Sequence, residues 1–172
     1  MPLIYITGSS GAGKSTIRKE LQVRGYEAHD TDEDGFSQWV NIKTKEQVRI
    51  PEAAKRHEGW FDEHAYMLSP EKVNELSAKA VNEKVFLCGI PSNDIDYFNV
   101  FDKIIFLEID KETMLDRIKN RDNNTFGQSE DSLALLLKWF DPIRLRYEKA
   151  GATFIDATKP VNLVVDEVIR NS

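Results

Sequence analysis

Cysteine is nearly absent from this 172-residue chain, which contains Cys88 alone. A single cysteine excludes an internal disulfide, and its place in the apolar run 85–88 predicts a buried strand thiol in a reducing compartment. No stretch approaches the roughly 20 apolar residues that a membrane span needs. The first residues enter a strand-like run directly, so we expect no signal peptide. These absences together predict a soluble, cytoplasmic protein.

A long basic run is also missing, and the formal net charge is -6. Both features argue against nucleic acid as the main partner. The sequence contains no internal repeat and no low-complexity tract, and a chain of this length can bury roughly 70% of its unfolded surface without a disulfide or a structural metal. We therefore expect one domain over residues 1–172. The oligomeric state stays open.

One motif is present in full, because residues 8–16 read Gly-Ser-Ser-Gly-Ala-Gly-Lys-Ser-Thr. Glycines permit backbone angles that let successive N–H groups cradle phosphate oxygens. In such a phosphate loop the lysine reaches the β- and γ-phosphates, and the serine hydroxyl is a Mg²⁺ ligand. The motif thus predicts ATP and Mg²⁺ as ligands. The predicted binding residues are Gly8, Ser10, Gly11, Ala12, Gly13, Lys14, Ser15 and Thr16.

The surroundings of this loop fit the same interpretation. An apolar strand-like run precedes it, and an amphipathic helix with Ile17, Leu21 and Val23 on its apolar side follows it. The helix starts near Gly13, so the positive end of its dipole adds to the anion site. Gly25 is placed to end that helix. The competing interpretation is an ordinary glycine-rich turn with an exposed lysine.

Strand-like and helical patterns alternate along the chain. We expect strands at 3–7, 27–29, 84–88, 103–109 and 153–156. We expect helices at about 14–24, 70–82, 111–121, 131–149 and 160–170. This alternation predicts an α/β fold with a parallel five-stranded sheet, helices on both of its faces, and ligands at the carboxyl ends of the strands.

Residues 33–69 interrupt the alternation. The runs 39–42 and 48–50 flank a polar turn and predict a β-hairpin, which Pro51 ends, and a short helix is expected at 52–57. Two of the three tryptophans, Trp39 and Trp60, lie in this segment. A long insertion is often functional, and a small satellite core in which the tryptophans pack explains it equally well. The two interpretations are compatible.

The phosphate loop, the small size and the strand-helix order resemble the nucleoside monophosphate kinase and shikimate kinase group of P-loop kinases. This resemblance implies a three-layer P-loop fold in which 33–69 binds the phosphate acceptor and 122–130 forms a short lid. Shikimate kinases carry Asp-Thr-Asp where this chain has Asp30-Thr31-Asp32. The likeness assigns Asp30 to the water shell of the metal that Ser15 binds, and Asp32 to the acceptor hydroxyl. The alternative is that one of them caps a following helix. We expect Glu33 and Asp34 to be solvated.

Residues 88–92 read Cys-Gly-Ile-Pro-Ser and are similar to the Asp-Gly-Phe-Pro-Arg stretch of adenylate kinases. Ser92 stands where that family has an arginine that binds the acceptor's phosphate. A neutral serine cannot make the bidentate contact of a guanidinium, which argues against a nucleoside monophosphate as acceptor. Cys88 stands where that family has an aspartate near the metal, which moves this role to Asp30.

Two arginines and a proline complete the site that the resemblance implies. Arg117 and Arg121 match the Arg-x-x-x-Arg at the root of the adenylate kinase lid, where the first stacks on adenine and the second reaches the transferring phosphates. The alternative is a solvated basic helix end. Pro160 matches a loop that closes over the adenine, and it can equally begin the last helix. Arg144 and Arg146 are either further phosphate ligands or surface charges.

Other polar residues are expected to be structural. Asp110 mimics a metal-binding acid after a strand, but it more simply caps the next helix. His57 and His64 are better explained as surface or pocket histidines than as metal ligands. Within the insertion, candidate walls of the acceptor pocket are Trp39, Arg49, Arg56, His57 and Trp60.

Three functions remain for this sequence. The first is an ATP-dependent phosphotransferase that moves the γ-phosphate to a hydroxyl of a small molecule, with Lys14, Asp32 and Arg121 as catalytic residues. The second is a nucleoside or nucleoside monophosphate kinase. The third is a nucleotide-binding switch or ATPase module, although the Asn-Lys-x-Asp guanine motif of a GTPase is absent from the sequence.

Overall fold

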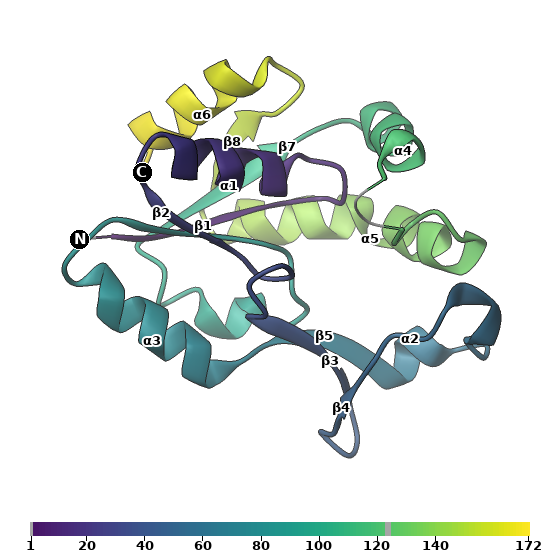
Figure 1. Ribbon diagram of the computed structural model, residues 1–172. Coiled ribbons are helices and arrows are strands. Elements are labelled where there is room, and N and C mark those ends of the chain that lie inside the picture. The colour runs from purple at the N-terminus through teal and green to yellow at the C-terminus, as the bar shows by residue number, and fades with distance from the viewer. Residues whose placement is uncertain (1, 123–124) are drawn as a thin grey trace.

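The computed structural model describes residues 2–122 and 125–172. Its centre is a parallel five-stranded sheet with the strand order β2-β6-β1-β7-β8 (Figure 1). These strands are β1 (Leu3–Gly8), β2 (Glu27–Asp30), β6 (Val85–Cys88), β7 (Lys103–Glu108) and β8 (Thr153–Asp156). The predicted parallel sheet is confirmed, with each strand within one residue of its expected bounds. Because β1 lies in the middle, the loop after it emerges at the centre of the sheet's carboxyl edge.

Helices cover both faces of this sheet. They are α1 (Lys14–Val23), α3 (Pro70–Ala80), α4 (Lys111–Asn120), α5 (Glu130–Lys149) and α6 (Val161–Arg170). Figure 1 shows α1 and α6 on one face and α3 on the other. In the ranges 2–122 and 125–172, no helix combines the length and the apolar character needed to cross a membrane.

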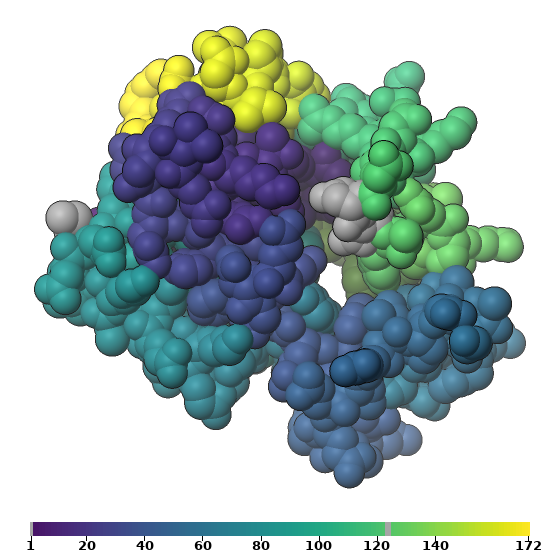
Figure 2. Space-filling view, viewed as in Figure 1, coloured from purple at the N-terminus to yellow at the C-terminus, as the bar shows by residue number. Residues whose placement is uncertain are grey.

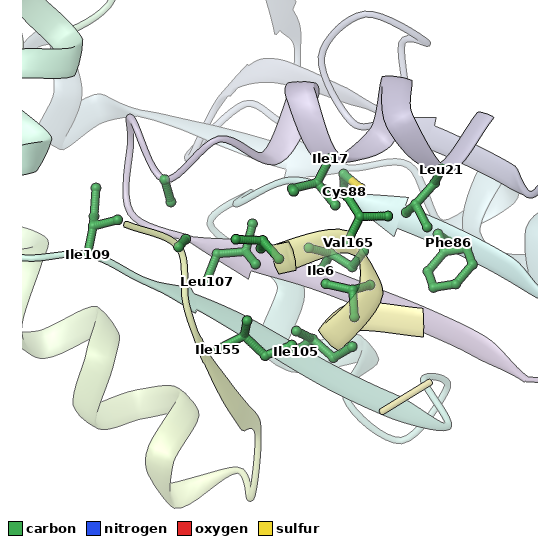
Figure 3. Packing of buried hydrophobic residues seen from close by; sticks show 14 of the residues in the cluster. Ile6, Ile17, Leu21, Phe86, Cys88, Ile105, Leu107, Ile109, Ile155 and Val165 are labelled. Atoms are coloured by element: carbon green, nitrogen blue, oxygen red, sulfur yellow. The ribbon is translucent and has the colours of Figure 1, made fainter. Parts of the chain in front are cut away.

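The alternation of side chains along β1 builds two cores. Ile4 and Ile6 point to the face covered by α1 and α6, whereas Leu3 and Tyr5 point to the face covered by α3. Figure 3 shows the first core, in which Ile6, Cys88 and Val165 pack together from different elements. Period-2 alternation in a strand buried on both sides gives each face its own apolar set.

The thiol of Cys88 is fully buried, as the sequence predicts, and burial raises its pKa above the usual value. The buried face of α1 differs from the prediction in one residue. Ile17 and Leu21 are buried, but Val23 is 81% exposed, and Arg18, only 7% exposed, turns inward instead. Val23 lies two residues after Leu21, about 200° around the helix, and so points away from the buried face.

The insertion forms a second, antiparallel sheet of three strands, β4 (Gln47–Val48), β3 (Ser37–Asn41) and β5 (His64–Leu68). The predicted hairpin is present, with Trp39 opposite Val48. The third strand, β5, was not predicted, because nothing in its local sequence alternates, and it exists only by pairing with β3. The helix expected at 52–57 is a single turn, η1 (Ala53–Lys55), and a short helix α2 (Trp60–Glu63) precedes β5.

Candidate functional site

A cavity of about 1440 Å³ opens at the carboxyl edge of the parallel sheet. Figure 2 shows a hollow in this region, between the insertion, the green α4–α5 region and the purple N-terminal segment. The lining comes from the phosphate loop, the end of β2, the insertion, the loop after β6, α4, α5 and the start of α6. A single cavity thus joins the predicted nucleotide loop to the predicted acceptor segment.

The phosphate loop has the conformation that its glycines permit. Gly13 caps α1 with a left-handed φ of 94°. A Cβ on Gly8 would lie 2.6 Å from the Leu107 carbonyl oxygen, so only glycine fits between β1 and β7. Lys14 Nζ donates to the carbonyl oxygens of Gly8 and Ser9 at 2.7 and 2.9 Å. The predicted loop residues that line the cavity are Ser10, Gly11, Ala12, Gly13, Lys14, Ser15 and Thr16. Gly8 contributes through its carbonyl oxygen, which accepts from Lys14.

Asp30 joins the end of β2 to the start of α1. The Ser15 hydroxyl donates to Asp30 Oδ2 at 2.9 Å, so the two residues predicted to serve the metal lie side by side. The other carboxylate oxygen accepts the backbone N–H groups of Asp32 and Glu33 at 2.9 and 3.3 Å. Residues 31–35 form turns, so Asp30 caps a turn rather than the helix considered above. Asp30 is 4% exposed and is held rigidly against the loop.

Glu33 and Asp34 are exposed, as expected, but each also has a partner within this part of the fold. Glu33 forms an ion pair with Arg18, and Asp34 accepts the backbone N–H of Asp30 at 2.7 Å. The physical reason is the burial of the Arg18 side chain, because a buried guanidinium requires a carboxylate partner. Both acids therefore stabilise the turn that presents Asp30 and Asp32.

The charges around Lys14 belong to the other predicted catalytic residues. Burial lowers the pKa of Lys14 from 10.5 to about 8, while Asp32 and Asp30 raise it and Arg121 lowers it further. The same short-range field acts on Arg121, whose pKa is lowered by burial and raised by Asp32. The fold therefore gathers Lys14, Asp30, Asp32 and Arg121 around one part of the cavity.

Tyr66 on β5 is a site residue that the sequence did not reveal. Its hydroxyl lies beside the Asp32 carboxylate, and burial, followed by this nearby carboxylate, raises its pKa far above the ordinary value. The backbone N–H of Ser92 donates to the Tyr66 carbonyl oxygen at 2.6 Å, which fixes β5 against the loop after β6. Because β5 has no local sequence signal, only its pairing with β3 places Tyr66 at this site.

The two arginines of the predicted lid root differ in their contacts. Arg117 donates to the carbonyl oxygens of Gly11 and Ala157 at 3.2 and 3.0 Å, linking the phosphate loop to the loop after β8. Arg121 donates to the Phe126 carbonyl oxygen, and its Nε is buried without a hydrogen-bond partner in the described part of the chain. Both side chains line the cavity.

Two predicted features have a less direct relation to the cavity. Pro160 is the N-cap of α6, and its neighbours Lys159 and Val161 line the cavity while Pro160 does not. The predicted lid, 122–130, includes Asn123 and Asn124, which lie outside the described residues. The flanking residues Thr125, Phe126, Gln128 and Ser129 line the cavity.

The insertion contributes both a pocket wall and a satellite core. Trp39 lines the cavity, and its ring lies 5.1 Å from that of Trp60, which is 5% exposed and packs behind it. Arg56 also lines the cavity, whereas Arg49 and His57 are exposed and do not. The insertion therefore contains the aromatic satellite core and also lines the cavity, and its role in binding stays a prediction.

Arg56 ties the insertion to the start of α5. Its Nε and Nη2 donate to the two carboxylate oxygens of Asp131 at 2.8 and 3.0 Å. Nη2 also donates to Ser129 Oγ at 2.9 Å, and Nη1 donates to the Pro51 carbonyl oxygen at 3.0 Å. These contacts hold the pKa of Asp131 well below its usual range.

A buried polar cluster lies beneath the acceptor end of the cavity. Asp94 lies on the short helix η2 (Asp94–Tyr97) and is fully buried. Its carboxylate accepts hydrogen bonds from the Tyr147 hydroxyl and, at 2.9 Å, from the Tyr5 hydroxyl. It also forms an ion pair with Arg146 at 3.2 Å. Burial raises the pKa of Asp94. Arg146, which lines the cavity, is thus neither a lone surface charge nor an unpaired phosphate ligand.

The remaining polar residues are structural. Asp110 caps α4 by accepting the Thr113 backbone N–H at 2.7 Å, as expected. His57 pairs with Glu63 at 3.2 Å, and His64 Nδ1 contacts the Trp60 carbonyl oxygen at 2.8 Å. Among residues 2–122 and 125–172 no cluster of three or more His, Cys, Asp and Glu side chains could hold a metal.

Comparisons with known proteins agree with this geometry. Residues 4–138 match the family described as AAA domain. The chain is 25% identical to a shikimate kinase of Bacillus cytotoxicus, over 99% of this chain and 98% of that protein. Its fold is similar to a shikimate kinase from Acinetobacter baumannii in complex with shikimate, with a TM-score of 0.61, 21% identity and coverage of 99% of this chain and 92% of that one.

Two further structures share the fold. For a shikimate kinase from Aquifex aeolicus the TM-score is 0.62 at 23% identity, covering 98% of this chain and 95% of that one. For a deoxyadenosine kinase from M. mycoides with bound dATP the TM-score is 0.52 at 17% identity, covering 98% and 97%. The resemblance stated from the sequence is confirmed: the chain belongs to the AAA domain family and has the fold of the nucleoside monophosphate and shikimate kinase-like P-loop kinases.

Proposed function

We propose that this protein transfers the γ-phosphate of ATP to a hydroxyl group of a small molecule. One observation carries the proposal: Lys14, Asp32 and Arg121 meet in a cavity that joins the phosphate loop to the insertion. The relatives support the reaction class, because the matching shikimate kinase and the structurally similar deoxyadenosine kinase are both kinases of small molecules. The acceptor then occupies the part of the cavity that the insertion lines.

The nucleotide lies on the other side of the cavity in this scheme. The amides of the phosphate loop and the N-terminus of α1 bind the phosphates. Arg117 holds together the phosphate loop and the loop after β8, between which the base would lie. Lys14 leaves the carbonyl oxygens of Gly8 and Ser9 and turns to the phosphates, which offer it a full negative charge.

The residues present also fit Mg²⁺. Ser15 Oγ and Asp30 Oδ2 lie 2.9 Å apart beside the phosphate loop and offer the oxygen donors that Mg²⁺ prefers. Ser15 would bind the ion and Asp30 would hold its water shell, and the ion would neutralise charge on the phosphates. A site with few protein ligands is usual for Mg²⁺, which keeps several waters and shares phosphate oxygens.

The catalytic step follows from the side chains. In a loose transition state the bond from the γ-phosphorus to the bridging oxygen breaks as the acceptor oxygen forms its new bond. Asp32 orients the acceptor hydroxyl and takes its proton, while Tyr66 fixes the Asp32 carboxylate. Lys14 and Arg121 place positive charge where negative charge develops, which is the largest contribution a kinase can make.

Two predicted assignments are part of the proposal. Residues 33–69 serve as the acceptor-binding segment and 122–130 as the lid of one domain spanning 1–172. The cytoplasmic location stays a prediction. An ATPase module without an acceptor is the competing function, but Glu108, the acid at the end of β7, pairs with Arg144 at 2.6 Å instead of facing the phosphate loop.

The test is ADP release coupled to acceptor phosphorylation, screened over hydroxylated metabolites, nucleosides and nucleoside monophosphates. Lys14→Ala should abolish transfer, and Asp32→Asn should lower turnover by orders of magnitude with little change in ATP affinity. Asp96→Asn, an exposed carboxylate outside the cavity, is the matched control and should keep full turnover. Full turnover in Lys14→Ala, or ADP formation with no phosphorylated product for any acceptor, would refute the proposal.

A further inference from the structure

The part of the cavity next to Asp32 has an aromatic wall. Tyr66 contacts the Asp32 carboxylate, and Trp39 lies directly opposite Tyr66 in the β3–β5 pairing, with their ring centroids 5.3 Å apart. Both rings line the cavity, as does the neighbouring Ser92. A molecule with its hydroxyl at Asp32 would therefore have its body beside the Trp39 ring.

The Trp39 ring is supported from behind. Trp60 packs edge-on against it with ring centroids 5.1 Å apart, and the rings of Phe61 and of Phe126, within the predicted lid, lie 5.7 and 6.4 Å away. Neither Trp60 nor Phe61 lines the cavity, so they act as backing rather than as wall. A large flat ring held in this way is a preorganised surface for stacking, because little side-chain freedom is lost when a ligand binds.

Arg56, a cation on this side of the cavity, already has its partners. Its three nitrogens contact Asp131, Ser129 and Pro51, and its side chain is 8% exposed. A guanidinium engaged bidentately by a carboxylate has satisfied the geometry with which it would otherwise bind an anionic ligand. Arg56 therefore seals the wall instead of offering a free charge.

Arg146 has a carboxylate partner through Nη2 alone, and its Nε is buried without a hydrogen-bond partner among the described residues. It pairs with Asp94 at 3.2 Å, and this carboxylate is fully buried and fixed by two tyrosine hydroxyls. Lys14 and Arg121, also on this side, face Asp30 and Asp32 and, in the proposed reaction, the transferred phosphate. The described cations on the acceptor side of the cavity thus all have a carboxylate nearby; they are Lys14, Arg56, Arg121 and Arg146.

From this wall and this charge balance we infer that the acceptor is an uncharged, hydroxyl-bearing ring compound that stacks on Trp39. The inference rests on the proposed function and narrows its substrate class. A carboxylate or phosphate on the acceptor would be desolvated without a free cation to receive it, which is costly. Shikimate, the ligand of one structural relative, is a carboxylate and is expected to be a poor acceptor here.

The experiment compares matched pairs of acceptors that differ only in charge. The pairs are the methyl ester and the free acid of shikimate, of glucuronic acid and of orotidine, which keep the same hydroxyls, each assayed with ATP for product formation. We expect an uncharged member to be phosphorylated, with kcat/KM at least about tenfold above that of its charged partner. A charged member that exceeds its uncharged partner overturns the inference.

A binding measurement decides the case in which no compound in the panel is phosphorylated. Tryptophan fluorescence is then titrated with the same compounds in the presence of ADP. Binding of an uncharged ring but not of its charged partner supports the inference, and binding of charged members only, or of none, overturns it. Failure of the proposed function reads differently: either ADP would form with no phosphorylated product for any acceptor, or Lys14→Ala would keep full turnover.

Variants at the aromatic wall separate stacking from stability. Stacking on an aromatic side chain contributes about 1–3 kcal/mol, so Trp39→Ala should raise the KM for the acceptor roughly 5- to 150-fold, and Trp39→Phe should restore most of it. Tyr26→Leu is the control, because Tyr26 packs on Phe86 in the other core and neither contacts Trp39 nor lines the cavity. It should lower the melting temperature and leave KM unchanged. An unchanged KM in Trp39→Ala would overturn the stacking role.

Discussion

Replacement of Gly89 by alanine tests how the fold positions the carboxylates of Asp30 and Asp32. A Cβ at position 89 would lie 2.7 Å from the Cβ of Thr31, and closer still to the hydroxyl and methyl groups of that side chain. Thr31 is fully buried and lies between Asp30 and Asp32. Its backbone cannot retreat easily, because its N–H donates to the Cys88 carbonyl oxygen at 2.8 Å and its carbonyl oxygen accepts from Ser37 at 2.9 Å.

The magnitude follows from this overlap. Forcing extra atoms into a packed site typically costs roughly 1–3 kcal/mol. Because the backbone is rigid on both sides, we expect Gly89→Ala to lower the free energy of unfolding by about 3 kcal/mol, the upper end of this range. For a chain of this size that corresponds to a fall in melting temperature of roughly 6–12 °C. A displacement of about 1 Å at Asp32 should lower kcat about 100-fold.

Thermal unfolding and the coupled kinase assay measure the two effects. The double variant Gly89→Ala with Thr31→Gly removes the obstructing side chain and should recover most of the stability and part of kcat. A Gly89→Ala protein with wild-type melting temperature and turnover would refute the reasoning. A double variant no better than the single one would show that the effect does not come from Thr31.

Three further outcomes are expected. A double-mutant cycle of Arg56→Ala and Asp131→Ala, measured by urea unfolding, should give a coupling free energy of about 1 kcal/mol. The value is small because the Asp131 side chain is 42% exposed. A coupling near zero would contradict the Arg56–Asp131 ion pair. The ATP affinity of the free protein should fall above about pH 8, because Lys14 loses its proton there. Lys14→Arg should remove this pH dependence, since arginine stays charged. An equally steep fall in the variant would show that Lys14 is not the titrating group. Cys88 should react with a thiol reagent only after unfolding, because it is fully buried with a raised pKa, and rapid labelling of the native protein would contradict this.

Part of the site could be predicted because it is local in the chain. The phosphate loop depends on glycine conformations and on the strand and helix that flank it, and all of these lie within about twenty residues. The pairing of Ser15 with Asp30 was implied by the family resemblance and is seen in the structure. The roles proposed for Asp32, Arg117, Arg121 and Pro160 stay predictions.

The alternation of strands and helices and the phosphate loop were determined by the sequence itself, because periodicity and glycine geometry act over short ranges. Only the tertiary structure decided the acceptor side. Tyr66 enters the site because β5 pairs with β3, Arg56 meets Asp131 across 75 residues, and Arg146 meets Asp94 across 52. Contacts of this kind come from the packing of distant segments, which local sequence patterns do not record.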